Sequence, residues 1–196
     1  MANRTKNNGN MINKIYHIAD VHIRNVKRHK EYRQVFRRLY SYIKKTKTDN
    51  DLIYVAGDIV HAKTDMSPEL VDLTSEFFSN LADLLPTIVI LGNHDCNLNN
   101  NYRLDALSPI VKAIKHQNLH YLKDNGVYDI QGVHFNVMAV DEKPAKYINA
   151  ADIEGNYKIA LHHGSVHNAS TDAGFTLSNT HVTTDMFIGH DLVLLG

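Results

Sequence analysis

Four apolar segments of the sequence are each followed by side chains that could bind a metal ion. The segments are KIYHIA, DLIYVA, PTIVI and KIAL, and each is typical of a buried strand. In open α/β sheets, ligands bind outside the carboxyl ends of the strands. Residues that follow four strands are therefore expected to meet at one edge and to form one metal site. The candidate ligands are Asp20, His22, Asp58, Asn93, His162 and His163.

These donors are carboxylate oxygens, an amide oxygen and imidazole nitrogens. That set suits Mn²⁺, iron or Zn²⁺ and disfavours metals that require thiolates. A carboxylate such as Asp58 can bridge two ions, and two ions about 3.5–4 Å apart can hold both the attacking and the leaving oxygen of a phosphoryl transfer. Asp20 and His22 are separated by one residue, so in an extended segment their side chains would share one side. The pattern predicts a centre of two divalent ions.

The elements that must position these side chains alternate between strands and helices in the first half of the chain. Strands are predicted over residues 14–20, 51–58 and 86–93. Apolar residues at helical spacing predict a helix over 30–45, between the first two strands. Ser67 followed by Pro68 is typical of a helix start and predicts a second helix before the third strand. This order predicts parallel strands joined by crossover helices.

The second half of the chain is predicted to be rich in strands. A short helix from Pro109 and a strand at LHYL precede a hairpin over 126–140, whose turn is expected at Gln131-Gly132. Two more strands are predicted over 157–164 and 191–196. Because the hairpin is antiparallel and the earlier strands are parallel, the predicted fold class is α/β: a layered β-sandwich of mixed sheets flanked by helices.

The composition is ordinary for a soluble globular protein, with 43% apolar and 21% charged residues among 196. We expect a flexible leader over residues 1–12 and one domain over 13–196. The longest apolar runs are too short to cross a bilayer, and the N-terminus lacks the apolar centre of a signal peptide. The single cysteine, Cys96, excludes an internal disulfide and a cysteine-based zinc site. It favours a cytoplasmic location, in the host cell if the protein is viral.

The formal net charge of +0 hides a strongly basic segment between Arg24 and Lys47. This segment holds ten Lys or Arg residues and one acid, Glu31, so the rest of the chain has an acidic balance. Most charge runs are solvated helix faces. The alternative is a surface that contacts the phosphate backbone of a nucleic acid. The candidate nucleic-acid contacts are Arg24, Lys27, Arg28 and Lys30.

The series Asp-x-His, Gly-Asp-x-x-His, Gly-Asn-His-Asp and a later His-Gly resembles the calcineurin-like metallophosphoesterase superfamily. The resemblance covers nearly the whole chain. It implies a dimetal centre that activates a bridging hydroxide for attack on phosphorus. Asp20 and His22 would then hold the first metal. Asp58 would bridge the two metals, and Asn93 would bind the second.

The same resemblance implies roles for residues near the metals. His94 would contact the phosphate and help to protonate the leaving oxygen. Asp95 would support His94 by a hydrogen bond that sets its tautomer. Either His162 or His163 would be a further ligand, and spacing alone does not choose between them.

A narrower resemblance connects the chain with the SbcD-type DNA repair nucleases, in the branch of phage and giant-virus recombination endonuclease subunits. His61, three residues after Asp58, is similar to the extra histidine of those nucleases, and ADVHIRNVKRHKEYRQVF and HHGSVHNASTDAGF are similar to regions of that branch. The resemblance implies Mn²⁺-dependent exonuclease and endonuclease activity on DNA in recombination or double-strand-break repair. It adds His61 to the catalytic residues and implies an SMC-like ATPase as partner. Zn²⁺, iron and Mg²⁺ stay open as alternative metals, and so does a homodimer.

The chain departs from the family pattern after its last apolar segment. A Gly-(His or Asp)-x-His motif that supplies the final histidine ligand is expected there, but DLVLLG stops at Gly196, and His190 precedes that segment. We therefore expect a truncated chain with one weakened metal site and little activity. Two other functions stay open: a small-molecule phosphodiesterase or phosphatase, and a non-catalytic DNA-binding subunit that keeps the fold.

Overall fold

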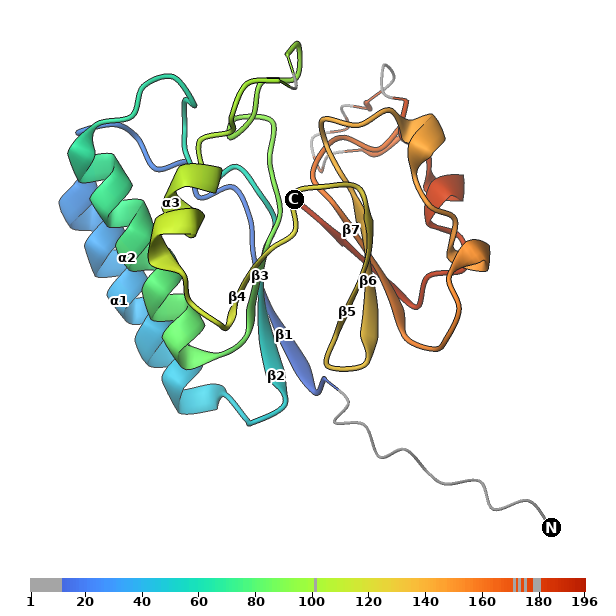
Figure 1. Cartoon of the computed structure of the whole chain (residues 1–196), viewed down its shortest axis with the longest axis horizontal. Helices are drawn as coiled ribbons and strands as arrows, with labels where there is room; N and C mark the ends of the chain where they lie inside the picture. The colour runs from blue at the N-terminus through green and yellow to red at the C-terminus, as the bar shows by residue number, and fades with distance from the viewer. Residues whose placement is uncertain (1–11, 101, 171, 173, 175, 178–180) are drawn as a thin grey trace.

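The structure is a computed structural model that describes residues 12–100, 102–170, 172, 174, 176–177 and 181–196. Two four-stranded sheets pack face to face (Figure 1). The first has the order β1-β2-β3-β4, and each neighbouring pair in it is parallel, which confirms the prediction for the first three strands. Its strands are Lys14–Ile18 (β1), Asp51–Val55 (β2), Thr87–Val89 (β3) and Leu119–Tyr121 (β4).

The second sheet has the order β5-β6-β7-β8 and mixes both kinds of pairing. β5 and β6 form an antiparallel hairpin, whereas β6 pairs with β7 and β7 with β8 in parallel. Gln131 and Gly132 have φ angles of 55° and 74°, the positive values that a tight hairpin turn requires, so the predicted turn is confirmed. The strands are Gly126–Ile130 (β5), Val133–Met138 (β6), Lys158–His162 (β7) and Leu192–Leu195 (β8).

Three α-helices cover the face of the first sheet that points away from the second sheet (Figure 1). They are His29–Thr46 (α1), Pro68–Leu84 (α2) and Ser108–Ile114 (α3), and the short 3₁₀ helices are Pro144–Lys146 (η1), Ala150–Asp152 (η2) and Thr184–Phe187 (η3). The predicted start of α2 is confirmed, because the Oγ of Ser67 accepts a hydrogen bond from the N–H of Leu70 at 3.3 Å. Within the described ranges, none of the helices combines the length and the apolar character needed to cross a membrane.

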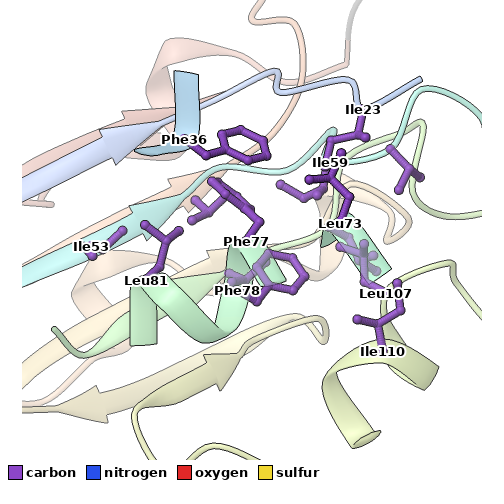
Figure 2. Close-up of a cluster of buried hydrophobic side chains, with 14 of the residues drawn as sticks. Ile23, Phe36, Ile53, Ile59, Leu73, Phe77, Phe78, Leu81, Leu107 and Ile110 are labelled. Carbon is purple, nitrogen blue, oxygen red and sulfur yellow. The ribbon is translucent and has the colours of Figure 1, made fainter. Parts of the chain in front are cut away.

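The core between the helices and the first sheet is built from the apolar faces of α1 and α2 (Figure 2). The ring centroids of Phe36 in α1 and Phe77 in α2 are 4.3 Å apart, and that of Phe78 is 5.8 Å from that of Phe77. Burying a side chain of this size stabilises a fold by about 1.5–3 kcal/mol. This packing fixes α1 and α2 against the sheet, and with them the loops at its carboxyl edge.

A second core lies between the two sheets. Leu52 and Tyr54 of β2 face this core, while Ile53 and Val55 face the helices, because alternate residues of a strand point to opposite sides. All five residues of β2 are buried, as expected for a parallel strand that is covered on both faces. Phe135 of β6 is fully buried in the same core from the other sheet. The position of the second sheet relative to the first is therefore set by apolar packing.

The first three strands end earlier than the sequence predicted. β1 ends at Ile18 instead of residue 20, because Asp20 and His22 have φ angles of 54° and 48°, and Asp58 beyond β2 has a φ of 53°. These left-handed values end a strand. Such backbone in non-glycine residues costs about 1–3 kcal/mol and clusters at functional sites. Asp20 and His22 therefore do not lie on an extended segment, and the alternation predicted for them does not explain why their side chains are close.

Candidate dimetal centre

The structure brings five of the six candidate ligands together at the carboxyl ends of strands from both sheets. Asp20 and His22 follow β1, Asp58 follows β2, Asn93 follows β3 and His163 follows β7. Four of the five line one cavity of about 400 Å³, and the Nε2 of the fifth, His22, is 3.4 Å from the Oδ2 of Asp58. Residues far apart in the sequence therefore share a single polar site.

The carboxylate of Asp58 lies between two pairs of donors. Its Oδ2 faces the Nε2 of His22, which is 3.6 Å from the Oδ1 of Asp20. Its Oδ1 is 3.3 Å from the Nε2 of His163, which is 3.1 Å from the Oδ1 of Asn93. Each oxygen of this carboxylate thus points to a different pair of donors.

The electrostatics of the site favour positive charge beside Asp58. Burial alone would raise the pKa of Asp58, but hydrogen bonds from His163 and from the backbone N–H of His94 outweigh it and hold the pKa below its ordinary value. Burial alone would lower the pKa of His163, but its contact with Asp58 and its bond to the carbonyl of Ala56 raise it. The two shifts share one cause, the close contact between this carboxylate and the imidazole of His163.

Two glycines let the loops after β2 and β3 approach closely enough to place Asp58. Gly57 has a φ of +84°, and a Cβ there would lie 2.6 Å from the backbone nitrogen of Gly92. A Cβ on Gly92 would overlap the backbone nitrogen and the Oδ1 of Asp58. The glycines of the second and third motifs are therefore required by the packing of one loop on the other.

His94 and His61 lie beside the Oδ2 side of Asp58. The Nδ1 of His94 is 2.7 Å from the backbone carbonyl of His61, and because a carbonyl only accepts, this nitrogen carries the hydrogen. The Nε2 of His94 faces the Oδ2 of Asp58 at 4.0 Å. The rings of His61 and His94 are stacked, with centroids 5.8 Å apart. Burial and the positive charge of Arg24 hold the pKa of His61 below its ordinary value.

Asp95 does not have the position that the sequence suggested. Its carboxylate is buried and accepts hydrogen bonds from the N–H groups of Ile59, Val60 and Gly92 at 2.9, 3.0 and 2.9 Å. The expectation that Asp95 sets the tautomer of His94 is wrong for this structure, because a backbone carbonyl holds the Nδ1 of that ring. Asp95 instead ties the loop after β2 to the loop after β3.

The structure separates the two adjacent histidines. His163 faces the cavity, with its Nδ1 held 2.7 Å from the carbonyl of Ala56. His162 ends β7, and its Nδ1 is 2.8 Å from the carbonyl of Met138. The ring of His162 lies 6.3 Å from that of Phe187, which belongs to the small core on the outer side of the second sheet. His163 is therefore the better placed candidate ligand.

The last apolar segment reaches the site, but His190 does not take part in it. Gly196, directly after β8, lines the cavity, and its carbonyl accepts from the N–H of Gly164 at 3.2 Å. The Nε2 of His190 is 3.0 Å from the Nδ2 of Asn136, and its Nδ1 is 3.0 Å from the carbonyl of Phe187. Both nitrogens of His190 are thus used in bonds within the fold, as expected of a structural residue.

The basic segment divides into a part beside the site and a part that runs away from it. Residues 24–30 connect β1 to the first residues of α1 at the edge that carries the site (Figure 1). α1 then runs away for 18 residues, about 27 Å, and Arg33 on it is paired with Asp72 and Glu76 of α2. The ten charges therefore do not form one surface. The candidate contacts near the site are exposed: Arg24, Lys27, Arg28 and Lys30.

Two polar residues that the sequence did not single out hold the loops of the site. The Nζ of Lys63 donates to the backbone carbonyl of Asn93 at 3.2 Å. The Nδ2 of Asn25 donates to Asp65 at 2.5 Å, and its Oδ1 accepts from the N–H of Ser67 at 3.3 Å. The bonds of Asn25 connect the loop after β1 with the loop before α2, and the bond of Lys63 connects that second loop with the loop after β3. A lone Lys or Asn in a loop has no spacing pattern, so the sequence carried no signal for either.

Two packed sheets carry oxygen and imidazole donors at their strand ends, and these form a candidate metal centre. The chain matches the calcineurin-like phosphoesterase family over residues 13–194 and belongs to that family. The superfamily inferred from the four motifs is thereby confirmed. The family uses divalent metal ions, which agrees with the donors found here.

The chain also has a relative in a giant virus. It is 45% identical over 192 residues to the uncharacterized protein R555 of Acanthamoeba polyphaga mimivirus, an alignment that covers 93% of this chain and 14% of that protein. The chain thus spans a small part of the length of this relative. Among solved structures, it is similar to the nuclease MPE of Pseudomonas putida, at 16% identity and a TM-score of 0.41, over 84% of this chain and 67% of that one. A likeness this weak carries no argument about the site.

Proposed function

We propose that the chain hydrolyses phosphodiesters at a centre of two divalent ions, and that its substrate is DNA. The observation that carries the proposal is the division of donors around Asp58. One carboxylate oxygen lies 3.4 Å from His22 and the other 3.3 Å from His163. A carboxylate with a separate donor pair on each oxygen suits two ions side by side better than one.

The donors fit divalent ions of the kind that phosphoesterases use. Asp20 and His22 would hold one ion, Asn93 and His163 would hold the other, and Asp58 would touch both. Oxygen donors favour Mn²⁺ or Mg²⁺, whereas imidazoles also admit Zn²⁺ or iron, and we propose Mn²⁺ for this mixed set. When bound, the two ions polarise the phosphoryl oxygen and neutralise the charge that develops in the transition state.

His94 is the proposed proton donor to the leaving oxygen. Its Nδ1 hydrogen is committed to the backbone at 2.7 Å, so the Nε2 is the nitrogen that can carry and release a second proton. His61, stacked on His94, would contact the same phosphate from the side. The role that we propose for Asp95 is positioning, since it holds the two loops that carry Asp58 and His94.

The proposal of DNA as substrate is supported by the cations beside the site. Arg24, Lys27 and Arg28 are exposed on the loop that follows His22, where they could hold the backbone of a strand whose phosphodiester lies at the metals. A small substrate would need no such row of charges. From the SbcD-type resemblance we further propose exonuclease and endonuclease activity in recombination or double-strand-break repair, with an SMC-like ATPase as partner. A homodimer is part of the same proposal.

The test compares linear double-stranded DNA with bis(p-nitrophenyl) phosphate as substrates, both with Mn²⁺. We expect the wild-type chain to cleave DNA and Asp58→Asn to cleave it at a rate lower by about 10²–10³-fold or more. This is the usual effect of removing one electrostatic contact to a transition state. Asp83→Asn is the matched control, because Asp83 is an exposed residue of α2 paired with His116. Hydrolysis of the chromogenic ester without DNA cleavage would favour a small-molecule phosphodiesterase. DNA binding without either reaction would favour the non-catalytic subunit.

A further inference from the structure

Three histidines form a cluster at the edge of the candidate centre. His22, His61 and His94 come from the loops after β1, β2 and β3, and each offers a ring nitrogen within 4.8 Å of the others. Their ring centroids are 4.8 Å apart for His22 and His94, and 5.8 Å apart for each of the other two pairs. Only His22 is one of the four donors around Asp58, so the cluster is a second set of potential ligands.

The nitrogens of this cluster are available to a metal. His94 donates through its Nδ1 to a backbone carbonyl, which leaves the lone pair of a neutral ring on the Nε2. A bond of this kind also fixes the ring orientation, as it does in established metal sites. The Nε2 of His22 lies 3.6 Å from the Oδ1 of Asp20 and 3.4 Å from the Oδ2 of Asp58, where a cation could be shared with these carboxylates. The Nε2 atoms of His22 and His94 are therefore placed to bind a metal.

We propose that His22, His61 and His94 form a three-imidazole site for a single Zn²⁺ ion. Imidazole suits Zn²⁺, whereas the oxygen-rich donors Asp20, Asp58 and Asn93 suit Mn²⁺ or Mg²⁺. Zinc sites with three histidines and one open position are an established coordination type. The Oδ2 of Asp58 is 4.0 Å from the Nε2 of His94 and 3.4 Å from that of His22, where it can serve as the fourth donor.

The geometry requires only a small contraction of the cluster. With zinc–nitrogen bonds of about 2.0–2.1 Å, the nitrogens of a tetrahedral site lie about 3.3 Å apart. The three nitrogens are within 4.8 Å of one another, and His61 is partly exposed on a loop. Rotation of partly exposed rings can supply a movement of this size without a change of fold.

The zinc site and the two-metal centre cannot be occupied at the same time, because both use His22. The zinc ion would also take the Nε2 of His94, the nitrogen to which we assign the proton for the leaving group. Zn²⁺ at the cluster should therefore stop Mn²⁺-dependent hydrolysis. This consequence rests on the proposed function, whereas the zinc site itself does not.

The test measures metal binding without substrate. Affinities for Zn²⁺ and Mn²⁺ are determined by competition with a chelator, and Co²⁺ is added as a spectroscopic probe of tetrahedral coordination. His61→Ala removes one imidazole of the cluster and leaves Asp58 and the four donors around it in place. We expect it to weaken Zn²⁺ binding by about 10- to 100-fold, to abolish the tetrahedral Co²⁺ absorption and to leave Mn²⁺ affinity unchanged. Asn93→Ala should show the opposite pattern.

Three controls keep the outcomes distinct. His116→Ala removes a half-buried histidine that bonds to Asp83 and is not one of the candidate ligands, and it should change neither affinity. Thermal melting verifies the fold of each variant, and His61→Asn replaces His61→Ala if the latter is unfolded. Zn²⁺ binding to His61→Ala at the wild-type affinity would overturn the proposal, and so would an equal loss of Zn²⁺ and Mn²⁺. DNA cleavage by the unaltered chain is assayed separately, so failure of the nuclease proposal and failure of the zinc site give different results.

Discussion

Replacement of Gly92 by alanine should displace the central carboxylate of the site while leaving the fold in place. The added Cβ would overlap the backbone nitrogen and the Oδ1 of Asp58 and lie 2.8 Å from its Cγ, whereas ordinary van der Waals contact is 3.4–4 Å. Contact with the Cγ alone requires a shift of roughly 0.6–1.2 Å, the closer Oδ1 and backbone nitrogen require more, and a misplacement of about 1 Å costs on the order of 10²-fold in rate. Overpacking of this kind also destabilises a fold by about 1–3 kcal/mol.

The assay for Gly92→Ala combines thermal melting, Mn²⁺ affinity and hydrolysis of a chromogenic phosphodiester. In a domain of this size, each 1 kcal/mol lowers Tm by about 2–4 °C. We expect a modest fall in Tm together with a loss of Mn²⁺ affinity and of activity that is much larger than the fall in stability explains. The reason is that the new methyl group overlaps the Oδ1 of Asp58, one of the two oxygens that a bridging ligand uses.

Gly132→Ala is the matched control for this experiment. Gly132 has a φ of +74° and no atom within 4 Å of an added Cβ, so its replacement strains the backbone without touching the site. The strain should cost about 1–2 kcal/mol, similar to the effect at Gly92. Wild-type metal affinity and wild-type activity in Gly92→Ala would refute the reasoning, because Asp58 would then tolerate the displacement or would not be a bridging ligand.

Three further changes test the arrangement of the site, the substrate and the core. His163→Ala should lower Mn²⁺ affinity by at least about 10-fold, whereas His162→Ala should leave it unchanged and lower only Tm; equal effects would contradict the separation of the two rings. Arg24→Ala should weaken DNA binding and lower the slope of log affinity against log salt by about 1, whereas Arg37→Ala, on the part of α1 that leaves the site, should change the slope less. Phe77→Ala should destabilise the fold by about 3–5 kcal/mol in chemical denaturation, and a loss under 1 kcal/mol would show that the helix–sheet core repacks.

The order of the helices and strands could be predicted from the sequence, and so could the position of the candidate ligands at one edge of the fold. Apolar periodicity is a property of the local chain, so α1, α2 and the hairpin turn at Gln131 could be predicted without any tertiary information. The residues at which the strands end could not be predicted in this way. Asp20, His22 and Asp58 adopt left-handed backbone because the site holds them there, and nothing in their residue types requires it.

The roles of individual histidines depend on partners that lie far away in the sequence. His162 and His163 are adjacent and chemically identical, and they differ because one bonds to Met138 in the same sheet and the other to Ala56 in the opposite sheet. Asp95 shows the same limit, since its partners belong to two separate loops. A motif thus identifies which residue types reach the site, and the packing of the sheets decides which atoms face it.

The bond between His163 and Ala56 explains why this centre needs both sheets. Ala56 follows β2 in the first sheet, and its carbonyl accepts from the Nδ1 of His163, which follows β7 in the second. That bond fixes the ring so that the Nε2 meets Asp58, also on the first sheet, at 3.3 Å. The distance between the two proposed metal positions is therefore coupled to the spacing of the sheets, which Tyr54 and Phe135 set by packing in the core between them. Apolar packing that touches no ligand is thus part of what determines whether two ions fit.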